Sequence, residues 1–204
     1  MSSHHFVKEG QEPAVFIIDP ISLELIEPLL EWAPLVIVLD SALDRVLLWG
    51  IKIDVVLTHK DQVEKIKEKI QEQAPVKIIS YEVEDDPVAT GFHFLTKNQQ
   101  RGVTAIVEPD KLSIFSFIHS LSTNLRVVLL NKDLRWSFIT VRKYKKWFPA
   151  HVKIRIQGTK DNQKFSTQGV TLLNSKWHAV DKDGTVTIQS ENNFWIGEDI
   201  EPSY

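Results

Sequence analysis

The chain has 204 residues and a formal net charge of −3, and 43% of its residues are hydrophobic and 25% charged. These values are typical of a globular protein with a sizeable core, and the charge balance excludes a general attraction to nucleic acid or to an anionic membrane surface. The lack of cysteine excludes disulfides, thiolate zinc sites and cysteine nucleophiles.

The N-terminal segment lacks the basic start and apolar run of a signal peptide. No apolar stretch approaches the ~18 residues that a membrane-spanning helix needs. We therefore expect a cytoplasmic protein with no membrane partner and no nucleic-acid partner. The adjacent His4 and His5 lie near a terminus, where we expect them to have no function.

Over the first 130 residues, short runs of Val, Ile and Leu alternate with helical patterns. The runs are nearly all apolar, as expected of parallel strands that are covered on both faces. They begin at Ala14, Leu35, Ile53, Val76, Val103 and Leu125. Between them, Ser22 and Asp110 are expected to cap helices. The alternation predicts an α/β domain with a doubly wound, mostly parallel sheet over residues 1–132.

After about Leu130, the runs become short, rich in β-branched and aromatic residues, and separated by turn residues. The sequence DKDG at 181–184 fits a hairpin turn. This pattern predicts a C-terminal antiparallel β-sandwich over residues 133–204. The segment RKYKKWF at 142–148 is expected to be a solvated basic face with a buried Trp147 rather than a nucleic-acid site.

Acidic residues follow the predicted parallel strands, at the edge where open α/β sheets bind ligands. They include Asp19, Asp40, Asp61, Glu82, Glu84, Asp85, Asp86, Glu108 and Asp110. Carboxylates in such places suit Mg²⁺ that also holds phosphate oxygens, but they are equally common in loops and at helix N-termini. Both interpretations stay open. The chain has only 8 glycines and no glycine-rich phosphate loop, so no backbone cradle for a pyrophosphate is predicted.

The segment VLDSALDRVLLWGIKIDVVL at 38–57 resembles the thiamine pyrophosphokinase family. The family's Asp-Gly-Gly-Ala-Asn-Arg-like stretch falls on residues 40–45, and its Gly-Ile-x-Pro-Asp motif falls on residues 50–54. Three further segments match in the same order: FHFLTKNQQRGVTAIV, KYKKWFPAHVKIRIQG and DKDGTVTI. The resemblance implies an α/β domain, a β-sandwich and a homodimer. Its active sites would lie between subunits and transfer a pyrophosphoryl group from Mg·ATP to thiamine.

The functional motifs of that family match this chain only in part. Its Asp-Phe-Asp-Ser turn falls on residues 59–62, which read HKDQ, and its Asp-x-Thr-Asp motif falls near residues 84–87, which read EDDP. Its Gly-Gly-Arg-x-Asp-His loop is replaced by PDKLSIFSFIHSL, and its Ser-Ser-Asn-Ser stretch falls on residues 176–179, KWHA.

The resemblance assigns catalytic roles to Asp61, Asp85 and Asp86, and metal binding to Asp61, Glu84 and Asp85. Cofactor binding is assigned to Asp40, Arg45, His59, Lys60, Trp177 and His178. Trp177 and Trp195 could stack on a flat ring or pack in the core. Lys60 and Lys111 could hold a phosphate without metal.

Replacing a carboxylate by the His59 imidazole removes a charge and a hard oxygen ligand, which weakens Mg²⁺ binding and slows phosphoryl-type transfer. We expect a thiamine pyrophosphokinase-like protein with degraded catalytic motifs, weakly active with Mg²⁺ and ATP or inactive. The alternative is a non-catalytic partner subunit, or a protein that binds a thiamine-like or phosphorylated small molecule.

Overall fold

The structure is a computed structural model that describes residues 12–108, 113–120, 125–174 and 177–200. It divides into two compact units, which are residues 1–108 with 123–126 and residues 109–122 with 127–204. The domain boundary expected at residue 132 stays a prediction.

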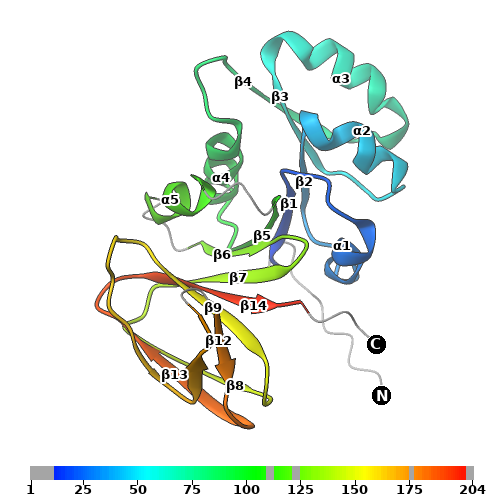
Figure 1. The fold of residues 1–204 in the computed structure, drawn as a ribbon. Helices are drawn as coiled ribbons and strands as arrows, with labels where there is room; N and C mark the ends of the chain where they lie inside the picture. Colours follow the sequence, from blue (N-terminus) through cyan, green and yellow to red (C-terminus); the bar gives the residue numbers. More distant parts are fainter. Residues whose placement is uncertain (1–11, 109–112, 121–124, 175–176, 201–204) are drawn as a thin grey trace, which may run out of the picture. The chain divides into compact units, whose positions relative to one another are not determined.

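The first unit contains five parallel strands in the spatial order β5-β1-β2-β3-β4. They are β1 (Ala14–Ile17), β2 (Val36–Leu39), β3 (Val55–His59), β4 (Lys77–Tyr81) and β5 (Gly102–Ile106). The connecting helices are α1 (Leu23–Leu30), α2 (Asp40–Leu48), α3 (Val63–Lys69) and α4 (Pro87–Lys97), with short 3-10 turns at Lys60–Gln62 and Gln71–Gln73. Figure 1 shows α1, α2 and α3 on one side of this sheet and α4 on the other. The predicted doubly wound parallel sheet is confirmed.

Burial on both faces explains why the central strands are apolar throughout. All four residues of β1 and of β2 are buried, whereas the edge strand β4 has no buried residue. Phe16 on β1 faces α4, where its ring meets that of Phe92 edge to face at 5.9 Å. Because successive side chains of a strand point to opposite faces, Phe16 packs against α4 on one face of the sheet and its neighbours on β1 face the other side.

The predicted cap at Ser22 is wrong in its chemistry. Ser22 occupies the N-cap position of α1, but its hydroxyl donates to the Glu24 carboxylate and caps no backbone N–H. The other predicted cap, Asp110, lies outside the described residues.

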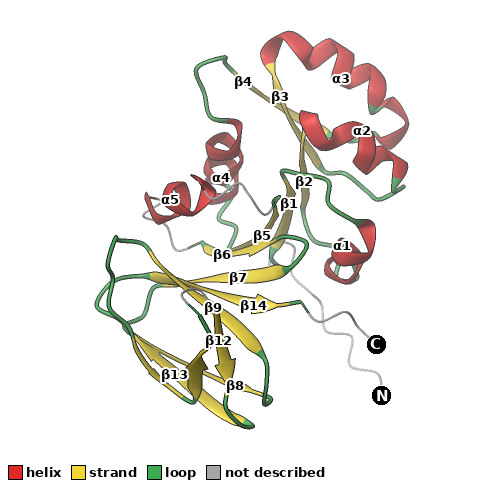
Figure 2. Ribbon diagram, viewed as in Figure 1, coloured by secondary structure: helices red, strands yellow, loops and turns green. Residues whose placement is uncertain are grey.

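The second unit is built mainly from strands, with the helix α5 (Ser113–Ser120) (Figure 2). One antiparallel sheet has the order β11-β12-β9-β14-β7-β6, and a smaller one has the order β10-β13-β8. The strands are β6 (Arg126–Leu130), β7 (Leu134–Ile139), β8 (Lys143–Phe148), β9 (Lys153–Gly158), β10 (Ser166–Gln168), β11 (Val170–Leu172), β12 (Trp177–Val180), β13 (Gly184–Gln189) and β14 (Phe194–Asp199). The predicted antiparallel sandwich is confirmed.

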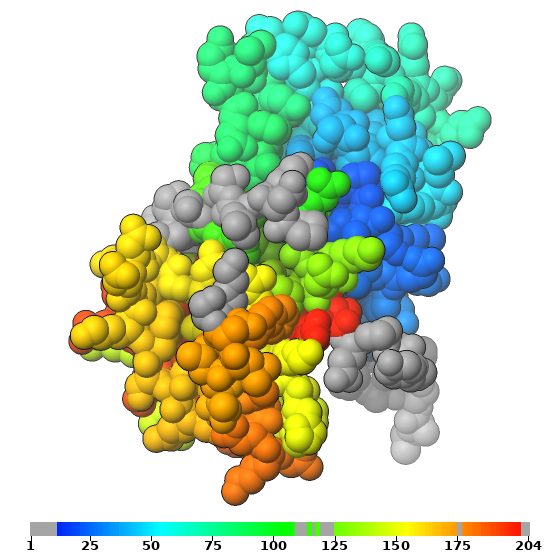
Figure 3. All heavy atoms as spheres, in the orientation of Figure 1, coloured from blue at the N-terminus to red at the C-terminus, as the bar shows by residue number. Residues whose placement is uncertain are grey.

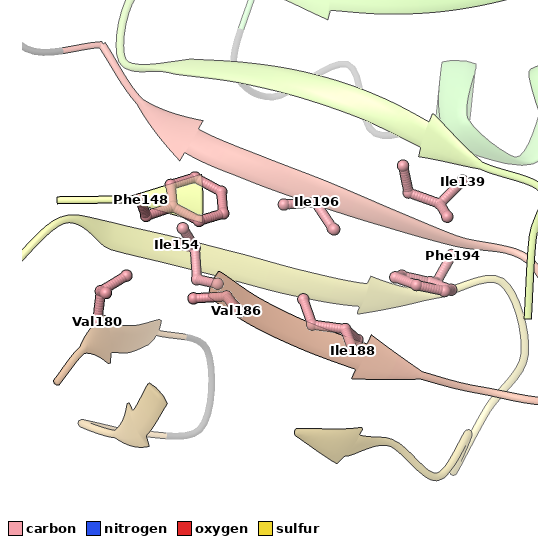
Figure 4. Close-up of a cluster of buried hydrophobic side chains, with 8 residues drawn as sticks. All are labelled: Ile139, Phe148, Ile154, Val180, Val186, Ile188, Phe194 and Ile196. Atoms are coloured by element: carbon pink, nitrogen blue, oxygen red, sulfur yellow. The ribbon is translucent and has the colours of Figure 1, made fainter. Parts of the chain in front are cut away.

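The sandwich core is formed by buried side chains from both sheets. Figure 4 shows this cluster, which consists of Ile139, Phe148, Ile154, Val180, Val186, Ile188, Phe194 and Ile196. Strand alternation decides which side chains join it: Phe148 on β8 is buried, whereas the preceding Trp147 is 60% exposed. The expectation of a buried Trp147 is therefore wrong, because the segment at 142–148 is an extended strand and Trp147 falls on its outer face.

No helix within the described ranges is long and apolar enough to cross a membrane.

Candidate functional site

Asp40 joins the ends of three neighbouring strands in the first unit. It follows β2 directly as the first residue of α2. Its carboxylate accepts hydrogen bonds from Thr58 Oγ1 at 2.8 Å, from the His59 backbone N–H at 3.4 Å and from the Tyr81 hydroxyl at 3.5 Å. Thr58 and His59 belong to β3 and Tyr81 ends β4, so the parallel register brings residues 18 to 41 positions apart to one carboxylate. Sequence reasoning placed Asp40 at this edge correctly.

Sequence reasoning missed Tyr81. Its ring packs edge to face on His59 with 6.0 Å between ring centroids, and the two residues are register partners on β3 and β4. Burial, followed by the charge of and hydrogen bond to Asp40, raises the pKa of Tyr81 above its ordinary value. A raised pKa stabilises the folded state below the unfolded pKa of about 10, and this stabilisation is lost as pH rises through the folded value. Tyr81 therefore stays a hydrogen-bond donor at neutral pH.

The His59 side chain contacts Asp61, two residues further along the chain. Its Nδ1 accepts a hydrogen bond from the Asp61 backbone N–H at 3.3 Å and lies 3.5 Å from Asp61 Oδ2. Nε2 is buried and has no hydrogen-bond partner within the described part of the chain. Asp61, the one acid in this turn, thus lies beside the His59 imidazole. The family that the sequence resembles has a second carboxylate at the position of His59.

The loop after β4 uses its acids for local structure. Lys60 forms an ion pair with Glu82, and this hydrogen bond and charge raise the pKa of Lys60. Asp85 accepts a hydrogen bond from the Glu82 backbone N–H at 3.0 Å. Asp86 is the N-cap of α4 and accepts from the Val88 and Ala89 backbone N–H groups at 2.8 and 3.1 Å. The role shown for Asp86 is that of a helix cap.

A magnesium site needs several carboxylate oxygens that converge and remain free to bind the ion. Here Asp40 and Asp86 accept two or more internal hydrogen bonds each, and Glu84 is exposed. Among the described residues, no group of three or more His, Asp or Glu side chains could hold a metal ion. These residues do not form a prearranged magnesium site, and the metal roles of Asp61, Glu84 and Asp85 stay a prediction.

The remaining cofactor candidates belong to other elements of the chain. Arg45 is on the exposed face of α2. Trp177 and His178 begin β12 in the second unit. The Arg155 guanidinium lies 5.4 Å from the ring centroid of Trp177 and equally far from that of Trp136. Burial lowers the pKa of His178.

Trp195 is a core residue, as the packing alternative for it expected. It is 1% exposed, and its ring lies 4.7 Å from that of Phe115 and 4.8 Å from that of Phe138. It has no open face for a flat ligand. Lys111, which was considered as a phosphate partner, lies outside the described residues, as do Lys176 and the histidines His4 and His5, which were expected to have no function.

No family model matches this chain, and no curated protein sequence matches it. Solved structures do match over nearly the whole chain. Thiamine pyrophosphokinase from Bacillus subtilis aligns with a TM-score of 0.68 at 14% identity, over 93% of this chain and 100% of that one. The yeast enzyme aligns with a TM-score of 0.71 at 10% identity, over 93% and 87% of the two chains. The enzyme from Candida albicans aligns with a TM-score of 0.64 at 9% identity, over 92% and 90%.

The fold is that of the thiamine pyrophosphokinases. At these low sequence identities, the similarity shows the thiamine pyrophosphokinase fold alone. The chemistry of this chain has to be argued from its own residues. In this chain, the Asp40 carboxylate accepts hydrogen bonds from three donors of the protein itself. The His59 ring accepts a hydrogen bond from the Asp61 backbone, and Asp86 caps a helix.

Proposed function

We propose that this chain is a thiamine pyrophosphokinase-like protein that has lost efficient magnesium-dependent pyrophosphoryl transfer and acts as a binding protein or partner subunit. One observation supports this proposal most strongly. The strand-end acids are engaged with the protein's own donors, above all Asp40 with Thr58, His59 and Tyr81.

The physical argument is one of charge and ligands. Transfer from Mg·ATP needs oxygen ligands for the ion and positive groups that stabilise the charge of the transition state. His59 supplies an imidazole where the family has a carboxylate, and the glycine-rich loop that would meet the phosphates is replaced. Losing a single group that stabilises developing charge typically slows a reaction by about 10²–10³.

We also propose that the chain forms a homodimer in the cytoplasm. The likeness of its fold to the thiamine pyrophosphokinases, over 93% of this chain, supports an assembly of the same kind.

The decisive experiment measures AMP release from ATP with thiamine and Mg²⁺, using purified and dialysed protein. We expect no AMP above a control without thiamine. A thiamine-dependent rate that EDTA abolishes would refute the proposal and establish a weak metal-dependent kinase, in which Asp61, Asp85 and Asp86 would be the first residues to mutate.

A matched variant tests the reason for the loss. His59→Asp restores the second carboxylate of the turn, and Gln62→Ser restores its last residue. A ligand that binds the native state raises the melting temperature. We expect Mg·ATP to raise the melting temperature of the double variant but not that of the wild-type chain. Equal shifts in both proteins would contradict our account of residue 59.

A further inference from the structure

A basic pocket lies at one end of the sandwich in the second unit. The register places three connections at this end. Phe194 pairs with Ile139 and with Gly158, so β14 begins where β7 and β9 end. In the other sheet, Gln189 pairs with Lys143 and Ser166, so β13 ends where β8 and β10 begin. The connections at 140–142, 159–165 and 190–193 therefore all pass from one sheet to the other at the same end.

The open pocket that these connections line has a volume of about 850 Å³, within the range of about 300–1,000 Å³ that is usual for small-molecule sites. Its charged lining residues are Arg142, Lys143, Lys160 and Lys164 against Asp161 and Glu191. The second unit is drawn in the space-filling view of Figure 3, where the yellow segments include the connection at 159–165. Because four of the charged lining residues are basic and two are acidic, the lining carries a net positive charge, although the whole chain carries −3.

The four cations of the pocket are available to a ligand. All four are exposed, and none of them forms a side-chain hydrogen bond or an ion pair with another described residue. Elsewhere on the same unit, Lys146 is neutralised by Glu198 at 2.5 Å. Because the four basic side chains outnumber the acidic Asp161 and Glu191 and form no ion pair with them, the pocket favours an anionic ligand.

The backbone that carries these cations is cross-linked by one side chain. Gln163 Nε2 donates to Ser190 Oγ at 2.7 Å and to the carbonyls of Asn192 and Asn193 at 3.2 and 3.1 Å. Gln163 Oε1 accepts from the Thr159 backbone N–H at 2.9 Å. These bonds tie the β9–β10 connection to the β13–β14 connection, which limits the entropy lost when a ligand binds.

We propose that this pocket binds a small molecule carrying two or more phosphate groups, without a metal ion. Four basic side chains against two acidic ones leave a net charge of +2 around this cavity, which suits a ligand with several phosphate charges better than a ligand with one. Lysine and arginine are the usual partners of phosphate. The site lies wholly within the second unit and does not depend on the lost transfer reaction proposed above.

Isothermal titration with inorganic tripolyphosphate in the presence of EDTA tests this site. We expect saturable binding that weakens several-fold when NaCl is raised from about 50 to about 300 mM, because salt screens exposed charges. The double variant Arg142→Gln, Lys164→Gln should weaken binding at least about tenfold. Its melting temperature should stay unchanged, because both side chains are exposed.

Lys182→Gln is the matched control, since Lys182 is an exposed lysine in the turn before β13, at the opposite end of that strand. It should alter tripolyphosphate affinity less than twofold. Thiamine, a cation, should not compete, whereas thiamine diphosphate should. Absence of tripolyphosphate binding, or equal losses in the control and the double variant, would overturn the proposal. Tighter competition by a single-stranded RNA than by thiamine diphosphate would also overturn it, in favour of a nucleic-acid surface.

Discussion

Asp40 accepts hydrogen bonds from three donors, and one of them, the Thr58 hydroxyl, belongs to a fully buried residue. Removing the shared acceptor leaves these donors unpaired, which costs about 1–3 kcal/mol for a buried group. The side chain therefore has a structural function whether or not it also meets a ligand.

We predict that Asp40→Ala lowers the free energy of unfolding by about 1–3 kcal/mol, measured by urea denaturation. Asp44→Ala on the same helix is the control. Asp44 forms an exposed ion pair with Lys69, and such pairs contribute no more than about 1 kcal/mol. Equal losses in the two variants would show that Asp40 does not hold the strand ends together.

At the scale of elements, α4 approaches the sheet closely because residue 91 is glycine. A Cβ at Gly91 would overlap the Phe16 ring and lie 2.9 Å from Leu57 Cδ1. Phe16 is fully buried and meets Phe92 of the same helix, so the ring has no room to withdraw.

We predict that Gly91→Ala destabilises the protein by about 1–3 kcal/mol through overpacking, despite the better helix propensity of alanine. Gly102→Ala in β5 is the matched control, because a Cβ there would meet its nearest atom at 3.5 Å, an ordinary contact. Thermal and urea unfolding of the two variants would separate these cases. A neutral Gly91→Ala would mean that α4 can shift away from the sheet without cost.

At the scale of the whole molecule, the proposed homodimer gives a direct prediction. Sedimentation equilibrium should yield a species of twice the 23.4 kDa chain mass over a range of micromolar concentrations. A dilution series serves as the control, because a true dimer dissociates by mass action as the concentration falls. A constant mass of 23.4 kDa at every concentration would rule the dimer out.

The sequence by itself determined the layered architecture. Runs such as AVFI in β1 and VIVL in β2 are apolar throughout because both of their faces are buried. The shorter, β-branched runs of the last third likewise predicted the sandwich strands. These signals are local, since each depends only on neighbouring residues and on which faces are buried. The acids after the strands were found for the same reason.

Only the tertiary structure decided what those acids contact. Asp40 and Tyr81 are 41 residues apart, and the register of β3 and β4 places the tyrosine beside the carboxylate. The register of the sandwich strands likewise puts three separate connections at one end, where they line the basic pocket. The packing of β8 decided which of its faces is the outer one, and Trp147 lies on that face. A hydrogen bond or a pocket depends on distances of a few ångströms between remote segments, and hydrophobic periodicity carries no information about such distances.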